Sequence, residues 1–204
     1  MKLYFSPGAC SLAPHIVLRE AKQPFTLEKV DTGTHKLADG SDYYAVNQKG
    51  QVPVLEMDGG GRLTEGPIIT QYIADKAART DLVPAAGTME RYRVMEWQNF
   101  ITSELHKGYT PLFNKTLDAE GKKVLSGVLL KKYQWLDEQL AGKTYLTGDT
   151  FTAADAYLFT VTNWSKYVGL DVSGFKNVQA FMARVAERPA VREAMAAEGL
   201  LGGK

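Results

Sequence analysis

The sequence predicts an α/β domain followed by an all-helical domain. Short β-rich runs alternate with helical patterns in the first 80 residues, whereas every later apolar pattern has helical spacing. Between the two parts, the segment "RTDLVPAAG" contains Pro84 and Gly87 and is typical of a linker. We therefore expect one domain over residues 1–80 and a second over 87–204, a division that is ordinary for a chain of 204 residues.

The first domain has the expected order β-α-β, then a loop, then β-β-α. Four runs, "KLYF", "FTLEKV", "VPVLEM" and "RLTE", have strand composition. Asp58 and the glycines 59–61 supply the backbone freedom that a hairpin between the last two strands needs. The segments "SLAPHIVLREA" and "GPIITQYIADKAA" predict helices, and Pro67 suits the first turn of the second one.

The second domain predicts helices only. The segment "TMERYRVMEWQNFITSELHKGYTPLF" carries one apolar stripe until Gly108 and Pro111 disturb it, and "VLSGVLLKKYQWLDEQLAGK" repeats apolar residues up to Gly142. "FTAADAYLFTVTNWSKYVG" is the most uniformly apolar segment, which indicates a helix in the middle of the bundle. Two last helices follow, separated at Pro189. The apolar positions of the first two segments are Val94, Trp97, Ile101 and Leu105, then Leu125, Val128, Leu129, Trp135, Leu136 and Leu140.

Composition excludes several classes of function. The net charge of +1 predicts no broad electrostatic field for nucleic acid or an anionic membrane surface. One cysteine and three scattered histidines form neither an internal disulfide nor a cysteine-rich zinc cluster, so we expect no metal. The apolar run at the start is too short for a signal peptide, and no run approaches membrane-spanning length. These features predict a cytoplasmic protein.

The single cysteine, Cys10, follows the first strand and a Ser-Pro-Gly turn. A lone cysteine is more often a small buried hydrophobic residue than a nucleophile. At this place, however, unpaired backbone N–H groups and the positive end of a helix dipole favour a thiolate. Ala13 stands where a redox CxxC pair would have its second cysteine, so Cys10 has no local resolving thiol.

Two further stretches suggest a peptide-like ligand. A cis Val52-Pro53 bond would leave the backbone of Val52 free to pair with an extended ligand, although Pro53 is also an ordinary strand start. Glu65 and Gly66 begin a helix, where N–H groups can bind a carboxylate and Glu65 can receive an ammonium. The alternative is that Thr64 and Glu65 merely cap the helix.

Together these residues resemble the cytosolic glutathione transferases, and specifically the bacterial beta class. The resemblance covers essentially the whole chain, from "PGACSL" through "NQKGQVPVL", "LTEGPIITQYIAD" and "ITSELHKGYTPLF" to "FTAADAYLF" and "ERPAV". In "FTAADAYLF", Thr152 and Asp155 have capping-box spacing, to which we assign a role in folding. The resemblance implies a thioredoxin-like domain with a mixed four-stranded sheet that holds glutathione, and a helical bundle that holds the second substrate.

The resemblance also implies roles for single residues of the first domain. Cys10 contacts or covalently binds the glutathione sulfur, Val52 with Pro53 pairs with the cysteinyl backbone, and Glu65 with Gly66 holds the γ-glutamyl end. Many other classes have serine where Gly66 stands. His35, beside Lys36, occupies the place of a lysine that contacts the glycine carboxylate.

The long helix adds Asn99, Ser103 and His106, which recur as a polar stripe and would ordinarily be a solvated face. By resemblance, His106 reaches the sulfur site and can donate a hydrogen bond to a thiolate, while Asn99, Ser103 and Glu104 contribute to the glutathione pocket. Four aromatic residues are candidates for the electrophile pocket, with core packing as the alternative for most of them. They are Tyr109, Phe113, Trp164 and Tyr167.

The resulting hypothesis is a homodimeric enzyme that conjugates the glutathione thiol to small apolar electrophiles, with Cys10-dependent disulfide exchange or peroxide reduction as an additional activity. Two alternatives stay open. In the first, the main activity is disulfide exchange of the glutaredoxin type. In the second, the protein is a non-catalytic binding or assembly module of the same fold.

Overall fold

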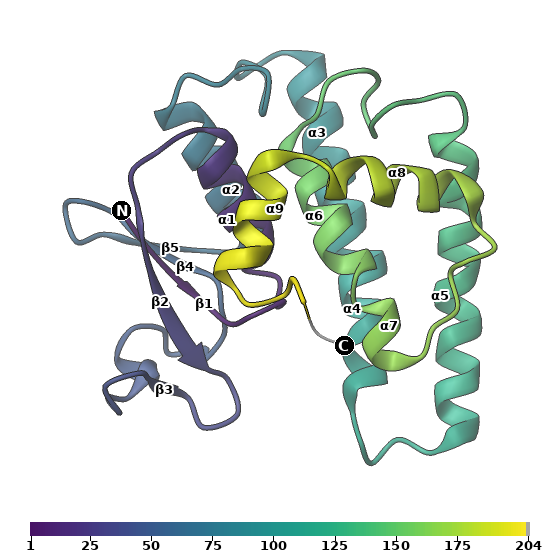
Figure 1. Cartoon of the computed structure of the whole chain (residues 1–204), viewed down its shortest axis with the longest axis horizontal. Helices are drawn as coiled ribbons and strands as arrows, with labels where there is room; N and C mark the ends of the chain where they lie inside the picture. Colours follow the sequence, from purple (N-terminus) through teal and green to yellow (C-terminus); the bar gives the residue numbers. More distant parts are fainter. Residues whose placement is uncertain (203–204) are drawn as a thin grey trace.

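The computed structural model describes residues 1–202, so residues 203–204 of the predicted second domain lie outside the described range. An α/β part and a helical part lie side by side (Figure 1). The C-terminal helix α9 (Pro189–Ala197) packs back against α1 (Leu12–Glu20) of the first part. This return of the chain fixes the two parts to each other.

The sheet has five strands, in the order β3-β2-β1-β4-β5, and not the four that the sequence predicts. They are β1 (Lys2–Phe5), β2 (Thr26–Asp31), β3 (Lys36–Leu37), β4 (Val54–Glu56) and β5 (Arg62–Thr64). The β1–β2 pair is parallel and the other three pairs are antiparallel, so the sheet is mixed as expected. The additional strand, β3, has two residues and is too short to produce an alternating pattern.

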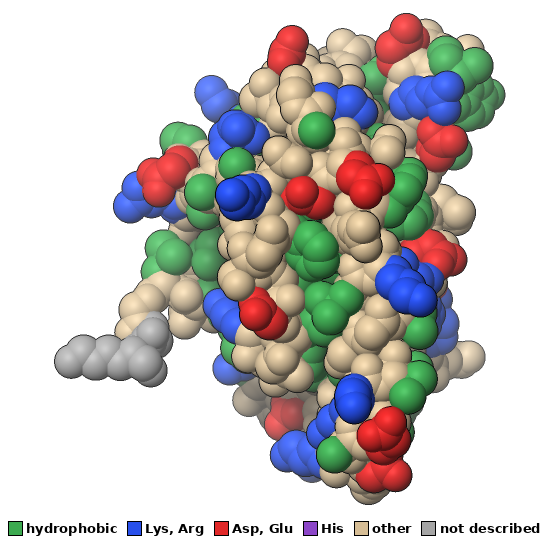
Figure 2. Space-filling model, turned by 90° about the vertical axis from the view of Figure 1, so that its right-hand side faces the viewer, with side chains coloured by type: hydrophobic (Ala, Val, Ile, Leu, Met, Phe, Trp, Pro, Cys, Tyr) green, Lys and Arg blue, Asp and Glu red, His purple; other side chains and the backbone are tan. Residues whose placement is uncertain are grey.

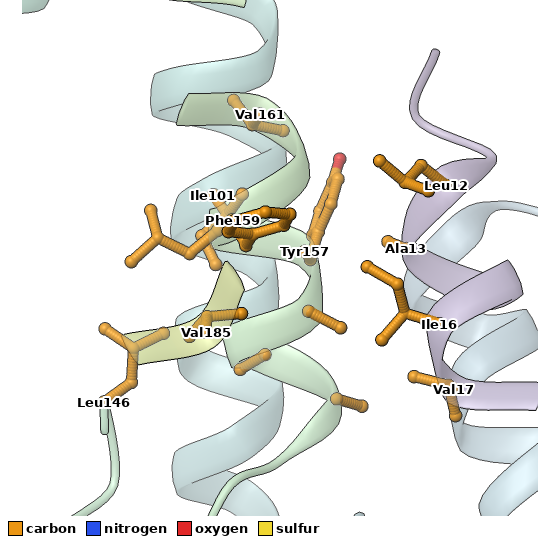
Figure 3. Packing of buried hydrophobic residues seen from close by; sticks show 14 of the residues in the cluster. Leu12, Ala13, Ile16, Val17, Ile101, Leu146, Tyr157, Phe159, Val161 and Val185 are labelled. Atoms are coloured by element: carbon orange, nitrogen blue, oxygen red, sulfur yellow. The ribbon is translucent and has the colours of Figure 1, made fainter. Parts of the chain in front are cut away.

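Helices α1 and α2 (Gly66–Lys76) pack against each other and against the second domain. One wide apolar face of α1 is buried, including Leu12, Ile16 and Val17. These side chains face α6 (Ala153–Thr162) across the domain boundary (Figure 3). The core is therefore continuous between the two domains.

The predicted long helix after the linker is divided into four segments. They are α3 (Met89–Phe100), a π-helical turn (Ile101–His106), α4 (Lys107–Tyr109) and a 3-10 turn (Thr110–Phe113). Four further helices complete the domain before α9, namely α5 (Ala119–Leu140), α6, α7 (Ser165–Val168) and α8 (Lys176–Ala186). The π-helical turn matters for the site, because such turns often occur where a helix presents functional side chains.

Helix α6 lies in the middle of the bundle, as predicted, and all ten of its residues are buried. Its N-terminus has the predicted capping box of Thr152 and Asp155. The buried Asp155 carboxylate accepts hydrogen bonds from the Thr152 N–H (2.8 Å), the Thr152 hydroxyl (2.9 Å) and the Leu146 N–H (2.8 Å). These contacts fix the start of the helix that later contributes Tyr157 to the site.

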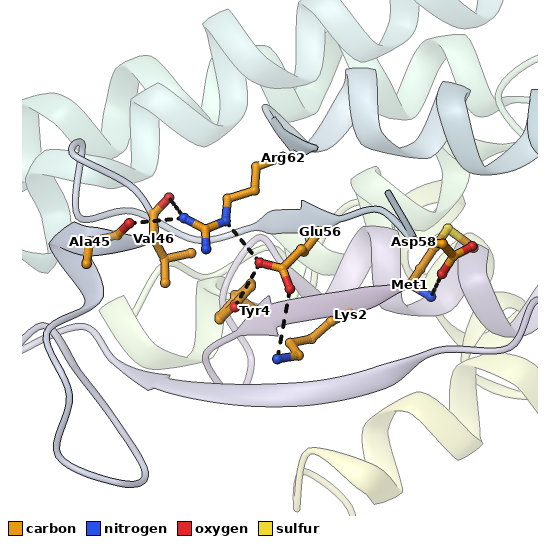
Figure 4. Close-up of polar contacts among 8 residues, drawn as sticks. All are labelled: Met1, Lys2, Tyr4, Ala45, Val46, Glu56, Asp58 and Arg62. Carbon is orange, nitrogen blue, oxygen red and sulfur yellow. Dashed lines mark hydrogen bonds and ion pairs between the residues drawn. The ribbon is translucent and has the colours of Figure 1, made fainter. Parts of the chain in front are cut away.

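A polar network ties the sheet to the turn that precedes the loop 47–53 (Figure 4). Arg62 Nε donates to Glu56 at 3.0 Å, and its Nη1 donates to the carbonyls of Ala45 (3.0 Å) and Val46 (3.2 Å). The Tyr4 hydroxyl donates to the same glutamate at 3.3 Å. The network holds the loop entrance against the sheet edge.

The outer face of the helical domain differs from the sequence prediction in one respect. Val128 and Trp135 on α5 are exposed, although their spacing predicts the buried stripe that Leu129 and Leu136 do form. On this face, hydrophobic side chains stand between interspersed positive and negative ones (Figure 2). Among residues 1–202, no helix combines the length and the apolar character that crossing a bilayer requires.

Candidate functional site

Cys10 lies in the turn between β1 and α1, where the sequence places it, and it is partly exposed. Its Sγ donates a hydrogen bond to the carbonyl of Val52 at 3.2 Å. One of the two Val52 backbone groups that we expected to be free for a ligand is therefore engaged by the cysteine. The contact joins the turn before α1 to the loop that carries Pro53.

The structure does not support a ready thiolate at Cys10. Desolvation raises the pKa of this thiol to about 12, although the backbone N–H groups of Cys10 and Ser11 act in the opposite direction. The predicted effect of the helix start is thus present, but burial of the sulfur outweighs it. Cys10 is a neutral thiol in the free protein.

The Val52-Pro53 bond is cis, as the peptide-binding interpretation requires. The loop before it is fixed by His35, whose Nδ1 lies 3.1 Å from the Gly50 carbonyl and whose ring packs on Tyr44 at 4.6 Å between centroids. Gly50 has φ +64°, and a Cβ there would lie 2.8 Å from the His35 ring. His35 therefore supports this loop, but it does not line the cavity that Val52, Pro53 and Glu65 share, which is described below.

Glu65 precedes α2 with φ +69°, a strained conformation for a residue with a side chain. Its carboxylate makes no capping hydrogen bond, which argues against the simple capping interpretation. Instead it accepts a hydrogen bond from Lys49 Nζ at 2.5 Å, and the same ammonium donates to the Thr64 hydroxyl at 3.1 Å. Glu65 therefore pairs with an ammonium group of this chain.

Two neighbouring cavities meet at Cys10 and His106. The first, about 80 Å³, is lined by the predicted residues Val52, Pro53, Glu65 and Gly66. The second, about 490 Å³, is lined by three of the four predicted aromatic residues, Phe113, Trp164 and Tyr167. Cys10 and His106 line both cavities, so a group held in the first and reaching toward Cys10 enters the second.

His106 is a neutral imidazole at neutral pH. Desolvation, and then the charge of Lys107, lower its pKa to about 4. Its Nδ1 lies 2.7 Å from the hydroxyl of Tyr157, and its ring meets Trp164 edge to face at 4.7 Å between centroids. Trp164 is held in turn by a 2.8 Å hydrogen bond from its Nε1 to the Gly8 carbonyl. His106 is therefore fixed by two side chains of the helical domain, one of which is held in turn by the first domain.

Four predicted site residues lie elsewhere in this chain. Tyr109 is fully buried, and its hydroxyl donates to that of Tyr133 at 2.9 Å, so it belongs to the core. Asn99 and Ser103 are exposed, with the Ser103 hydroxyl donating to the Asn99 carbonyl at 3.1 Å. Glu104 pairs with Lys132. None of these four lines either cavity.

The sequence interpretation missed several lining residues of the first cavity. Lys49 lies inside the quoted motif "NQKGQVPVL", and Lys107 directly follows His106. Tyr157 lies in "FTAADAYLF", where it is the one polar side chain besides the capping pair Thr152 and Asp155, and that is the signal that could have identified it. The complete set of missed lining residues is Asn47, Lys49, Gln51, Thr64, Pro67, Thr102, Lys107 and Tyr157.

The donor groups of this site suit an organic ligand. Within residues 1–202, no three histidine, cysteine, aspartate or glutamate side chains lie close enough together to hold a metal ion. The first cavity instead combines backbone groups, one carboxylate and two lysines. Such a set can bind a zwitterionic, peptide-like molecule.

Fold and site together define a two-domain protein in which an α/β domain presents a cysteine beside a cis-proline loop to an all-helical domain. Family models agree with this description. The N-terminal domain model of the glutathione S-transferases matches residues 1–75, and their C-terminal domain model matches residues 100–189. The chain belongs to the glutathione S-transferase family.

Individual relatives point to the bacterial members. Glutathione S-transferase GstA of Escherichia coli O157:H7 is 48% identical, over 98% of this chain and 100% of its own length. A beta-class glutathione S-transferase from Sphingomonas chungbukensis is 44% identical with a TM-score of 0.94, over 98% of this chain and 100% of that one. A sphingomonad glutathione S-transferase complexed with glutathione is 42% identical with a TM-score of 0.94 at the same coverage. These similarities agree with the predicted beta class.

Proposed function

We propose that this protein is a glutathione transferase that conjugates the glutathione thiol to small apolar electrophiles. The observation that carries the proposal is the sharing of Cys10 and His106 by the two cavities. A tripeptide held in the first cavity places its sulfur at the junction, and an apolar molecule in the second lies beside it. Binding both partners together supplies proximity.

The first cavity offers partners for the γ-glutamyl and cysteinyl parts of glutathione. Glu65 is placed to receive the α-ammonium, the N-terminus of α2 suits the adjacent carboxylate, and the Val52 backbone suits the cysteinyl unit. In the free protein the Lys49 ammonium is hydrogen bonded to the Glu65 carboxylate, so the ammonium of the ligand must replace that of Lys49. The sphingomonad relative complexed with glutathione supports this assignment.

Activation of the sulfur requires stabilising its thiolate. His106 is neutral and can donate one N–H, Lys107 brings a positive charge to the same cavity, and the turn before α1 brings backbone N–H groups. The thiolate then attacks the electrophilic carbon, a carbon–sulfur bond forms, and the leaving group departs with the electron pair of its bond. The protein itself forms no covalent bond in this reaction.

Cys10 supports a second activity, disulfide exchange. Its thiolate attacks a glutathione mixed disulfide at the glutathione sulfur, releasing the other thiolate and leaving glutathione bonded to Cys10. The thiolate of a second glutathione then forms oxidised glutathione and restores Cys10. The raised pKa of Cys10 slows this exchange near neutral pH.

We also propose a cytoplasmic homodimer. Tyr92 and Met95 are exposed on one side of α3, and the i, i+3, i+4 spacing continues to Asn99 and Ser103 on the same side. A partner subunit covering this side would bury the apolar side chains and bring the two polar residues to an interface. Light scattering of the wild type and of Tyr92→Glu tests this, because the substitution should shift the mass toward the monomer, and a monomeric wild type would contradict the proposal.

The experiment for conjugation measures glutathione binding by calorimetry and the reaction with chlorodinitrobenzene on the same preparation. We expect saturable binding and a conjugate of the expected mass. Binding without any conjugate over a panel of electrophiles would favour the non-catalytic alternative. Absence of glutathione binding would overturn the proposal altogether.

A further inference from the structure

Tyr157 is the one hydroxyl-bearing aromatic side chain of α6, and it has no part in the capping of that helix. Its side chain is buried between α6 and α1, with the hydroxyl at the Leu12 end of α1 (Figure 3). Tyr157 lines the first cavity, and its hydroxyl lies 2.7 Å from His106 Nδ1. A buried phenol in such a short contact restricts which ring nitrogen carries the proton.

The available protons can be counted. The Thr102 hydroxyl has one proton and lies 2.8 Å from the Gln98 carbonyl, which can only accept. That proton is therefore not available to Tyr157, whose hydroxyl lies 3.4 Å from Thr102 Oγ1. The Tyr157 proton has two acceptors within reach, Thr102 Oγ1 and His106 Nδ1, and the imidazole nitrogen is the closer by 0.7 Å.

We propose that Tyr157 donates its hydroxyl proton to His106 Nδ1 and so holds the imidazole in the tautomer whose Nε2 carries the hydrogen. Among residues 1–202, Nε2 has no hydrogen-bond partner, and His106 lines both cavities. The N–H that remains is thus available to the glutathione sulfur. This role rests on the proposed conjugation, and it makes Tyr157 a positioning residue that acts through His106.

The role assigned to Tyr157 is distinct from the electrostatic effects of its neighbours. The other titratable groups that line the same cavity are Cys10, Lys49, Glu65 and Lys107. None of them hydrogen bonds to the His106 ring among the described residues. Removing the Tyr157 hydroxyl therefore changes the tautomer balance without removing a charge.

The direct experiment is nitrogen NMR of the imidazole rings in the wild type and in Tyr157→Phe. The chain has three histidines, so a His106→Asn sample identifies the His106 signals. We expect the proton on Nε2 in the wild type and a mixture of both tautomers in Tyr157→Phe. A wild-type proton on Nδ1 would overturn the proposal whether or not the protein conjugates glutathione.

Kinetics add a second readout. We expect Tyr157→Phe to keep glutathione affinity, to lower kcat for conjugation near pH 7 about two- to tenfold, and to recover as the pH rises and the thiolate forms unaided. Tyr133→Phe is the matched control, because it removes another buried hydroxyl, bonded to Tyr109 and Thr162 and absent from both cavities. Equal losses in the two variants, or a loss in Tyr157→Phe that no pH relieves, would mean that Tyr157 acts only in folding.

Discussion

The two cavities that meet at Cys10 and His106 are built in different ways. The first is narrow and is lined by fixed features: a cis peptide, a residue with positive φ, a helix N-terminus and an ion pair. The second is about six times larger and is lined by aromatic side chains, two of which, Phe113 and Tyr167, are about half exposed. Backbone geometry and charge select one ligand, whereas an open aromatic surface accepts many.

Because of this difference, the binding of glutathione and the binding of the electrophile should depend on different residues. Changes in the first cavity should alter glutathione binding and leave the electrophile's KM unchanged, and changes in the second should do the reverse. Only the shared junction should affect both substrates.

The largest effect is expected from Glu65→Ala. Removing a charge-assisted hydrogen bond to the ligand ammonium should cost about 1.5 to 3 kcal/mol, or roughly a ten- to 150-fold weaker Kd for glutathione. Calorimetry measures this, and the KM for the electrophile at saturating glutathione should not change. Glu193→Ala, which removes an exposed ion pair with Arg19, is the control. If both variants bind glutathione equally well, Glu65 is not the ammonium receptor.

At the junction, the free protein should resist alkylation. The pKa of the Cys10 thiol is about 12, against an ordinary 9.0, so Cys10 has about a thousandfold less thiolate than a cysteine peptide. A thiolate of higher pKa is also more nucleophilic, which partly offsets this loss. Iodoacetamide should therefore react with Cys10 about thirty- to sixtyfold more slowly than with a cysteine peptide. The rate should rise about tenfold per pH unit from pH 7 to 10, because the thiol is still titrating. Since the chain has one cysteine, Cys10→Ala is the blank. A rate that levels off near pH 7 would show that the helix start prevails over burial.

A smaller effect is expected in the second cavity. Phe113→Ala removes a half-exposed ring that packs on Trp164, and should raise KM for an aromatic electrophile by about fivefold, which corresponds to about 1 kcal/mol. Glutathione affinity should stay the same. Phe100→Ala is the control, because Phe100 packs on Trp97 and Trp135 away from both cavities. A weaker glutathione Kd in Phe113→Ala would remove the distinction between the cavities.

The contrast between the cavities also explains what the sequence could predict. Features encoded by neighbouring residues, such as Cys10 after a strand, Val52 before Pro53, and Asp155 three residues after Thr152, were found because local chemistry determines them. The short strand β3 has no pattern to detect. The core position of Tyr109 depends on Tyr133, which lies 24 residues further along the chain.

The electrostatics of the junction depend on packing in the same way. Helix-end groups act on Cys10 as its position predicts, yet the surrounding chain removes enough water to reverse the outcome. Likewise, the contact between His106 and Tyr157 joins residues 51 positions apart. A linear pattern shows which groups are available, but only the folded arrangement determines their protonation.

The central claim is that the reacting sulfur in conjugation belongs to glutathione, and that Cys10 is needed only for disulfide exchange. The most direct measurement compares both activities in Cys10→Ala, using chlorodinitrobenzene for conjugation and a glutathione mixed disulfide for exchange. We predict that exchange falls to the background rate while a substantial part of conjugation remains. Complete loss of conjugation in a folded variant that still binds glutathione would contradict the account, because it would make Cys10 itself the obligatory catalytic group.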